Sequence, residues 1–254
     1  MEFLRVASGE AAASLAVLNK DDESLPPRAR ALVRLARALT AQPWALSADV
    51  LADAARHGLD RDQLEAAVGV ISMFNYFTRV ADATGIEFDY LSPLPAFEPD
   101  TNQSAAPRPG PSGSSGRVVA KGPRQPRHRP LRAAWESWRS YVLESDKPIG
   151  ERQRWLLACI AAEESADWDQ AEALGGFGSL TPDDDELVRF ARKLSREPWR
   201  MTVADLERLR VVGYSDEALL HIISVVAHQN ADSRFAAGLR VVNSAFPGES
   251  GGVE

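Results

Sequence analysis

The sequence predicts an all-α fold, a helical bundle made of two tandem copies of one unit. Residues 32–85 recur at 187–240, and the matched pairs all lie 155 positions apart. Within each copy the apolar residues recur at intervals of three and four, which is the period of an amphipathic helix. The alternation of apolar and polar residues that is typical of strands is absent. Because an internal repeat is stronger evidence of fold than composition, the chain is interpreted as a duplication.

The repeat is carried by identical residues. In the first copy they are Leu32, Val33, Arg34, Ala36, Arg37, Leu39, Pro43, Trp44, Leu51, Gly58, Leu64, Val70, Asn75, Arg79 and Ala81. In the second copy they are Leu187, Val188, Arg189, Ala191, Arg192, Leu194, Pro198, Trp199, Leu206, Gly213, Leu219, Val225, Asn230, Arg234 and Ala236. The constant shift predicts that the same elements follow one another in both copies.

Each copy begins with a helix that ends before a proline, Pro43 or Pro198. The residue before a proline is disfavoured in the helical conformation, so the proline marks the boundary. Ser47 and Thr202 then stand where an N-cap residue would open a short second helix.

The short helix ends at a glycine, Gly58 or Gly213, because glycine adopts the left-handed C-cap conformation without penalty. A long third helix is expected from Asp62 to Thr84 and from Asp216 to Val242. Each unit is therefore predicted to be a helix, a short helix and a long helix.

These residues also carry a family resemblance. The run Phe-Asn-Tyr-Phe-Thr-Arg-Val-Ala-Asp-Ala-Thr-Gly at 74–85 resembles the C-terminal half of the alkylhydroperoxidase D and carboxymuconolactone decarboxylase (AhpD-like) superfamily. Residues 132–172 resemble its N-terminal half, with a Pro-Leu-x-x-Ala-Trp helix and the sequence Glu-Arg-Gln-Arg-Trp-Leu-Leu-Ala at 151–158. The resemblance implies two degenerate AhpD-like units.

Peroxide-reducing proteins of this superfamily carry a Cys-x-x-Cys-x-x-x-His helix, and the resemblance would place it next. This chain has one cysteine, Cys159, inside an apolar helical run. A dithiol mechanism is therefore excluded, and Cys159 is expected to be a small buried apolar residue.

The repeat predicts four regions. Residues 1–90 form a truncated first unit, with a helix expected at 8–19, and residues 131–247 form the second unit. Residues 248–254 form a tail. Residues 91–130 are rich in proline, glycine and serine and basic towards their end, which is typical of a solvated, mobile linker. The alternative for this basic stretch is a site for an anionic ligand or nucleic acid, but no aromatic residues interleave for base stacking.

Composition sets further bounds. The chain has 254 residues, a net charge of −7 and 44% hydrophobic residues, enough for a sizeable core or two modest ones. No apolar run approaches the ~20 residues of a membrane span. The N-terminal sequence shows no evident signal peptide, and one cysteine gives no disulfide framework, so a cytoplasmic location is expected.

The first candidate site is the acidic run 163–172, interpreted as one helix. Glu164, Trp168 and Glu172 are four residues apart and would share one face. Glu163, Glu164 or Asp167 would transfer protons with His228 as partner, because a carboxylate against an aromatic wall gains a raised pKa. Trp168, Glu172 and Asp232 would contact the substrate. The alternative is a solvated acidic face with Trp168 in the core.

The second candidate is the pair His228 and Asp232, one helical turn apart. They could form a proton-relay pair or bind one metal ion, or His228 could pair with the carboxylate at the surface. We expect no metal. The first copy has Met73 and Phe77 at the equivalent positions, which suggests a single working pocket.

Asn75 with Arg79, and Asn230 with Arg234, are retained in both copies. Since the first copy lacks half a unit, residues kept in both copies are interpreted as structural, with each arginine tying helices together through its planar donors.

These observations predict a protein without redox cysteines that acts on a small organic molecule by acid/base chemistry, such as decarboxylation, isomerisation or cyclisation, without a cofactor. The alternative is a non-catalytic scaffold or ligand-binding protein. A homodimer is expected because the truncated first unit leaves apolar helix faces to cover. Nucleic-acid and membrane partners are not expected.

Overall fold

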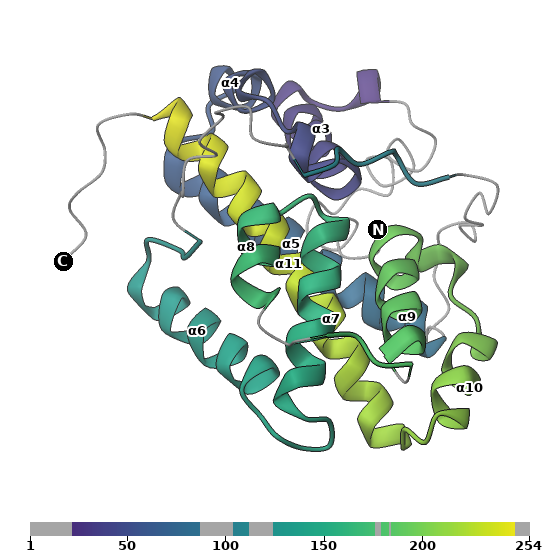
Figure 1. Cartoon of the computed structure of the whole chain (residues 1–254). Coiled ribbons are helices and arrows are strands. Elements are labelled where there is room, and N and C mark those ends of the chain that lie inside the picture. The colour runs from purple at the N-terminus through teal and green to yellow at the C-terminus, as the bar shows by residue number, and fades with distance from the viewer. Residues whose placement is uncertain (1–21, 87–103, 112–123, 176–178, 183, 247–254) are drawn as a thin grey trace.

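The computed structural model describes residues 22–86, 104–111, 124–175, 179–182 and 184–246 (Figure 1). Throughout these ranges the regular elements are helices and no strand occurs, which confirms the predicted all-α class. The helix expected at 8–19, the tail at 248–254 and much of the predicted linker lie outside the described residues. None of the helices described has both the length and the apolar character needed to cross a membrane.

Both copies contain the predicted helix, short helix and long helix. After a 3-10 turn, η1 (Asp22–Ser24), the first copy consists of α3 (Pro27–Ala41), η2 (Pro43–Ala45), α4 (Ala48–Arg56) and α5 (Arg61–Thr84). The second consists of α9 (Asp184–Arg196), η4 (Pro198–Arg200), α10 (Val203–Val211) and α11 (Asp216–Ala245). Between the copies lie α6 (Arg129–Leu143), α7 (Glu151–Glu164) and α8 (Trp168–Leu174). These three helices precede α9, and none of them has a described counterpart before α3.

The predicted helix boundaries are nearly those observed. Each proline that follows the first helix begins a 3-10 turn. Gly58 and Gly213 have φ values of 79° and 104°, so both occupy the left-handed region that glycine tolerates. Thr202 is the N-cap residue of α10, and its backbone N–H donates to the Asp205 carboxylate at 2.9 Å. Ser47 holds the N-cap position of α4 without a capping bond from its side chain.

The two long helices, α5 and α11, pack side by side through the centre of the molecule (Figure 1). Their backbones approach closely at Gly238, where an added Cβ would lie 2.4 Å from Val68 Cγ1. Glycine is therefore required at this crossing, because Val68 is branched at Cβ and has little freedom to move away.

Reciprocal hydrogen bonds tie the copies together across these helices. Arg79 of α5 donates to the carbonyl of Ser195 at 3.1 Å, and Arg234 of α11 donates to the carbonyl of Thr40 at 3.0 Å. Thr40 and Ser195 are themselves equivalent in the repeat. Each arginine also bonds to the asparagine one turn earlier in its own helix, Asn75 or Asn230.

The asparagines complete this exchange within their own copies. Asn75 donates to the Thr40 hydroxyl at 2.9 Å, and Asn230 donates to the Ser195 hydroxyl at 2.8 Å. The retained Asn-Arg pairs therefore hold the ends of α3 and α9 against the central helices, in agreement with their interpretation as structural.

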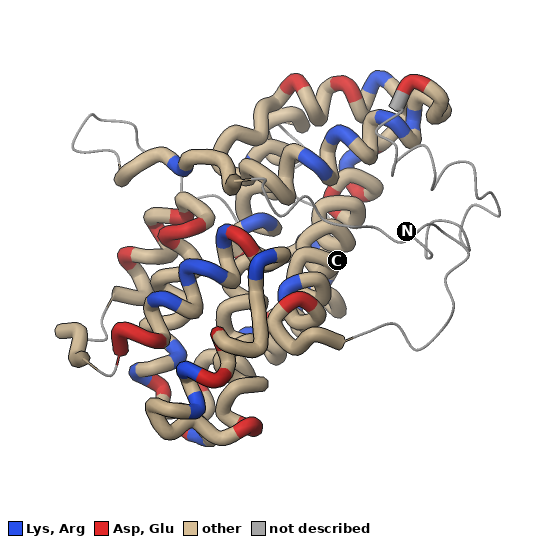
Figure 2. The backbone as a smooth tube through the Cα atoms, turned by 90° about the vertical axis from the view of Figure 1, so that its right-hand side faces the viewer, with Lys and Arg blue, Asp and Glu red and all other residues tan. Residues whose placement is uncertain are grey.

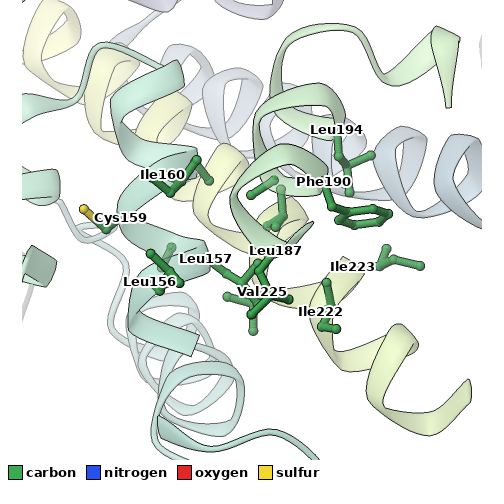
Figure 3. Packing of buried hydrophobic residues seen from close by; sticks show 14 of the residues in the cluster. Leu156, Leu157, Cys159, Ile160, Leu187, Phe190, Leu194, Ile222, Ile223 and Val225 are labelled. Atoms are coloured by element: carbon green, nitrogen blue, oxygen red, sulfur yellow. The ribbon is translucent and has the colours of Figure 1, made fainter. Parts of the chain in front are cut away.

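Two hydrophobic clusters form the core, and both contain residues of both copies. The larger lies among α7, α9 and α11, where Leu157, Phe190 and Val225 are fully buried (Figure 3). It also includes Ala83 of α5. The second surrounds α3, α4 and α5 and includes Phe235 of α11. The copies are thus packed into one another.

The face of α11 that packs against α7 has an exposed counterpart on α5. Val225 is 0% exposed, whereas the equivalent Val70 is 54% exposed. Asp232 is 4% exposed and its equivalent, Phe77, is 54% exposed. Basic and acidic residues are both spread over the described helices (Figure 2). The expected homodimer stays a prediction.

Because α5 and α11 approach closely, we expect substitutions of their internal glycines, Gly238 and Gly69, to differ in effect. Gly238→Ala should lower the free energy of unfolding by about 1 to 2 kcal/mol, since overpacking against Val68 exceeds the gain in helix propensity. Urea denaturation followed by circular dichroism measures it.

Gly69→Ala is the matched control on α5. Its added Cβ would lie 3.6 Å from Phe235 Cε2, an ordinary contact. This variant should be unchanged or stabilised by up to about 1 kcal/mol. If both substitutions changed the free energy of unfolding equally, α5 and α11 would not be in close contact at Gly238.

Candidate functional site

The acidic run 163–172 is not one helix, contrary to the sequence-based expectation. α7 ends at Glu164, and Ala166 takes a left-handed φ of 52°. The N–H of Ala166 bonds to the carbonyl of Glu163, and the N–H of Asp167 bonds to the carbonyl of Ala162, each at 2.9 Å. These two bonds form a Schellman motif, which satisfies the last carbonyls of α7. α8 then begins at Trp168 in a new direction.

This break sends the candidate carboxylates to different places. Glu164 and Asp167 are both buried, but they bind different arginines. Glu163 is half-buried on α7, and Glu172 is exposed on α8. Glu164, Trp168 and Glu172 therefore do not share one helical face.

Glu164 is surrounded by three guanidinium groups. Arg108 contacts Glu164 Oε2 at 3.1 Å, Arg196 contacts it at 3.4 Å, and Arg192 lies 3.6 Å from Oε1. Arg108 also lies over the ring of Trp168, 5.0 Å from its centroid, in a cation–π contact. Three cations share one carboxylate, so two positive charges at this end of α9 are not balanced by Glu164.

Asp167 and Asp232 meet at a single arginine, Arg124. The guanidinium donates to both oxygens of Asp167, at 3.0 and 2.7 Å, and to Asp232 Oδ2 at 2.6 Å. Trp135 Nε1 donates to Asp232 Oδ1 at 3.2 Å. Burial alone would raise the pKa of Asp232, but the charge and hydrogen bonds of Arg124 lower it below its ordinary value.

His228 lies beside this cluster in an aromatic environment. Its ring centroid is 4.4 Å from that of Trp138 and 6.5 Å from that of Trp135. The side chain is fully buried, and neither ring nitrogen has a hydrogen-bond partner among the described residues. Burial lowers the pKa of His228 to about 4, although the charge of Asp232 opposes this shift. His228 and Asp232 are close but do not form the hydrogen-bonded pair that a proton relay requires.

A metal site is also not formed by these side chains. Among the described residues, no group of three or more His, Cys, Asp or Glu side chains is arranged to hold a metal ion. Cys159 is buried beside α8, with its sulfur 3.4 Å from the carbonyl oxygen of Ala171. Burial, together with the charge of Glu163, raises the pKa of this thiol to about 11. Cys159 is therefore a buried thiol, as the sequence predicts.

A hollow of about 630 Å³ lies along α9, next to Glu164. Its walls include four cations of α9, namely Arg189, Arg192, Lys193 and Arg196, together with Glu164, Asp185, Glu197, Val188 and Ala105. The spacing of the cations by three and four residues places them on one helical face. We call this hollow the α9 groove.

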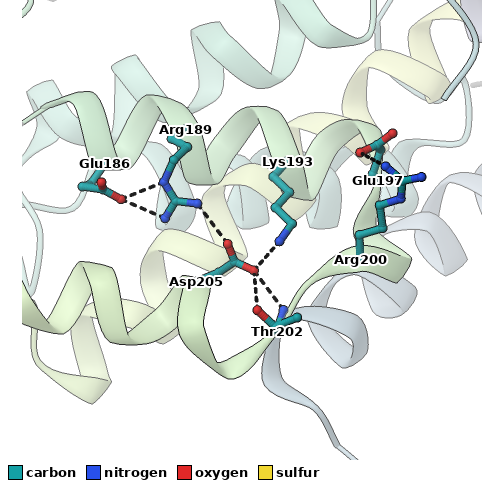
Figure 4. A network of polar contacts seen from close by, with 7 residues as sticks. All are labelled: Glu186, Arg189, Lys193, Glu197, Arg200, Thr202 and Asp205. Atoms are coloured by element: carbon teal, nitrogen blue, oxygen red, sulfur yellow. Dashed lines mark hydrogen bonds and ion pairs between the residues drawn. The ribbon is translucent and has the colours of Figure 1, made fainter. Parts of the chain in front are cut away.

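The far end of the α9 groove is held by a network of ion pairs (Figure 4). The Asp205 carboxylate accepts from Arg189 at 2.9 Å and from Lys193 at 2.6 Å. Arg189 also pairs with Glu186 at 2.8 Å. Arg189 and Lys193 are thus balanced by acids, whereas the carboxylate that Arg192 and Arg196 contact among the described residues is Glu164, which they share with Arg108.

A smaller hollow of about 250 Å³ lies near the start of α11. Arg154 is fully buried there and donates to the carbonyls of Val142, Lys147 and Ile149. Its guanidinium also lies 3.1 Å from His221 Nδ1, so this ring nitrogen is the acceptor and the proton is on Nε2.

Sequence reasoning missed the arginines that contact the candidate carboxylates. Arg108 and Arg124 lie in the segment interpreted as a linker, and Arg124 belongs to its basic part. The sequence contains both a basic segment, in residues 91–130, and an acidic run, at 163–172, and this combination could have indicated that the two form ion pairs. The four cations on one face of α9 were a second signal.

Comparison with models of protein families, with curated proteins and with solved structures finds no match to this chain.

The environment of His228 predicts a pH dependence of stability. Its pKa is about 4 in the folded protein and near 6.5 in the unfolded chain, so the unfolded state binds more protons between these values. His228 therefore stabilises the fold fully above pH ~6.5, and this contribution is lost as the pH falls towards 4. The slope is up to about 1.4 kcal/mol per pH unit.

Urea denaturation at several pH values measures this slope in wild type and in His228→Phe. The substitution should remove the part of the slope that lies between pH 6.5 and 4. His128→Gln, at an exposed histidine, is the control and should keep the wild-type slope. An unchanged slope in His228→Phe would contradict the neutral, buried state of His228.

A second prediction concerns Cys159. A single thiol with a pKa of about 11 is little ionised at neutral pH and has no resolving partner. The protein should give no steady turnover of an organic hydroperoxide with dithiol reductants. Turnover that Cys159→Ser reduces to background would disprove this.

Proposed function

We propose that this chain is a ligand-binding protein of AhpD-like type, which holds a small organic anion in the α9 groove. The observation that carries the proposal is the arrangement of three guanidiniums around the single buried carboxylate of Glu164. Three guanidiniums thus share one carboxylate at the edge of a hollow, and a carboxylate or phosphate group of a ligand would supply further acceptors for them.

The geometry of Arg192 and Arg196 supports this role. The side chain of Arg192 is 55% exposed and lies 3.6 Å from Glu164, so its guanidinium can bind a ligand with little desolvation. Arg196 is held more firmly, because it also donates to the carbonyl of Ala106 at 2.7 Å. Glu164 thus positions the arginines and leaves donors for an anion.

The walls of the groove favour an organic ligand over a bare ion. Val188 and Ala105 supply apolar surface next to the cations. A volume of about 630 Å³ is within the range of small-molecule sites. The groove belongs to the second copy alone, since the first copy has Ala38 and Ala41 at the positions of Lys193 and Arg196.

Acid/base chemistry is the second candidate, and His228 is the observation that favours it. Its imidazole is fully buried near the Asp232 carboxylate, and no described residue forms a hydrogen bond with either nitrogen, which is unusual for a buried polar group. It ranks second because Glu164, Asp167 and Asp232 are already engaged by arginines. For Asp232, the charge and hydrogen bond of Arg124 lower the pKa below its ordinary value, which weakens this carboxylate as a base.

The test uses citrate, benzoate and inorganic phosphate as ligands, with binding measured by isothermal titration calorimetry at low ionic strength. At least one of these anions should bind saturably to the wild type. Arg192→Ala should weaken that binding about tenfold or more, because it removes a charge-assisted hydrogen bond.

Arg37→Ala is the matched control, since Arg37 is the equivalent of Arg192 in the first copy and is also exposed. It should bind like wild type. The same loss in both variants, or no saturable binding of any of the three anions, would reject the α9 groove as an anion site.

A further inference from the structure

Arg124 is inserted into a cage of protein groups that would suit a guanidinium from any source. Asp167 accepts from both of its terminal nitrogens, Asp232 accepts from one of them, and Trp135 holds Asp232 from the other side. We propose that Asp167, Asp232 and Trp135 form a guanidinium-binding site, which Arg124 fills in cis and from which another guanidinium can displace it. This site is separate from the α9 groove.

The charge of the cage selects a cation. Two carboxylates face one guanidinium, so the cage keeps a negative charge even when Arg124 is bound. Their side chains are only 3% and 5% exposed, and leaving a buried charge unpaired is strongly destabilising. Arg124 can therefore leave readily only when a second cation takes its place.

The shape of the cage selects a guanidinium among cations. Two parallel bonds to Asp167 require two N–H groups in one plane, which a guanidinium presents and an ammonium does not. All three bonds are made by the terminal nitrogens, so a ligand needs only a terminal guanidinium on an alkyl stem.

The position of Arg124 allows exchange. Its side chain is 28% exposed, so the guanidinium enters the cage from the surface. It precedes α6 in a stretch without regular structure, and its release would not require any helix to unwind. The same stretch is also anchored at Arg127, whose N–H donates to Glu65 at 2.6 Å.

An unexplained group lies beside this cage. His228 is one turn from Asp232 on α11 and is fully buried, and within the described part of the chain neither of its ring nitrogens has a hydrogen-bond partner. A larger guanidino compound that carries a hydrogen-bonding group could satisfy it, which Arg124 does not.

The experiment uses methylguanidinium at millimolar concentrations and the full-length variant Arg124→Ala. Thermal shift and calorimetry should show saturable binding to this variant. Wild type should bind at least about tenfold more weakly, because the tethered Arg124 competes at a high effective concentration. Urea, a neutral planar analogue, and methylammonium should bind at least about tenfold more weakly than methylguanidinium.

Two variants separate this site from the other charges. Arg127→Ala removes an arginine from the same stretch and should behave like wild type. Arg124→Ala combined with Asp167→Asn should lose at least about tenfold in affinity, because one charged acceptor is gone. If Arg124→Ala folds only when methylguanidinium is present, its refolding yield should rise saturably with the methylguanidinium concentration and not with methylammonium.

The source of the guanidinium is distinguished by a second ligand, an N-acetylated and C-amidated peptide with one central arginine. Binding of the peptide as tightly as methylguanidinium points to an arginine of a protein chain, and binding of methylguanidinium alone points to a small compound. A folded Arg124→Ala variant that binds neither ligand overturns the proposal.

Discussion

The reciprocal bonds of Arg79 and Arg234 are the constraint on which the rest of the structure depends. Both guanidiniums are buried, and burial lowers the pKa of Arg79 to about 10 and holds that of Arg234 well below its ordinary value. Among the described residues no carboxylate bonds to either of them; each is held by carbonyl and amide oxygens, partly from the other copy. Separating the copies would remove the carbonyl of Ser195 from Arg79 and that of Thr40 from Arg234, and losing an acceptor of a buried charge is costly in a low-dielectric interior.

The fixed arrangement of α5 and α11 then places the candidate site. α7 and α9 pack on α11 through Leu157, Phe190 and Val225, and the Schellman motif at Ala166 sets where α8 begins. Glu164 consequently contacts Arg108, Arg192 and Arg196, whereas Asp167 contacts Arg124. Proton transfer by these two carboxylates would require them to leave those partners, whereas recognition of charged ligands uses them in place.

The repeat made most of the fold predictable, because identical residues such as Pro43 and Pro198 mark the same boundaries twice. The break between α7 and α8 was not predictable, since Ala166 holds a left-handed conformation that glycine would have signalled. The site was predicted only in part. Asp167, His228 and Asp232 are brought together, but their contacts with Arg124 and Trp135 depend on packing between distant segments, which periodicity does not encode.

Thr40 and Ser195 make the contact between the two copies symmetric. Each accepts, through its backbone carbonyl, from the arginine of the opposite copy, and each accepts, through its hydroxyl, from the asparagine of its own copy. Such an exchange, in which residue i contacts j and j contacts i, is the signature of an isologous two-fold interface between identical subunits. The chain thus contains within one polypeptide the contact of a symmetric dimer. Because that contact lies entirely in the repeated helices, the other surfaces of the two copies can differ without loosening the joint, as the exposed Phe77 and the buried Asp232 at equivalent positions show.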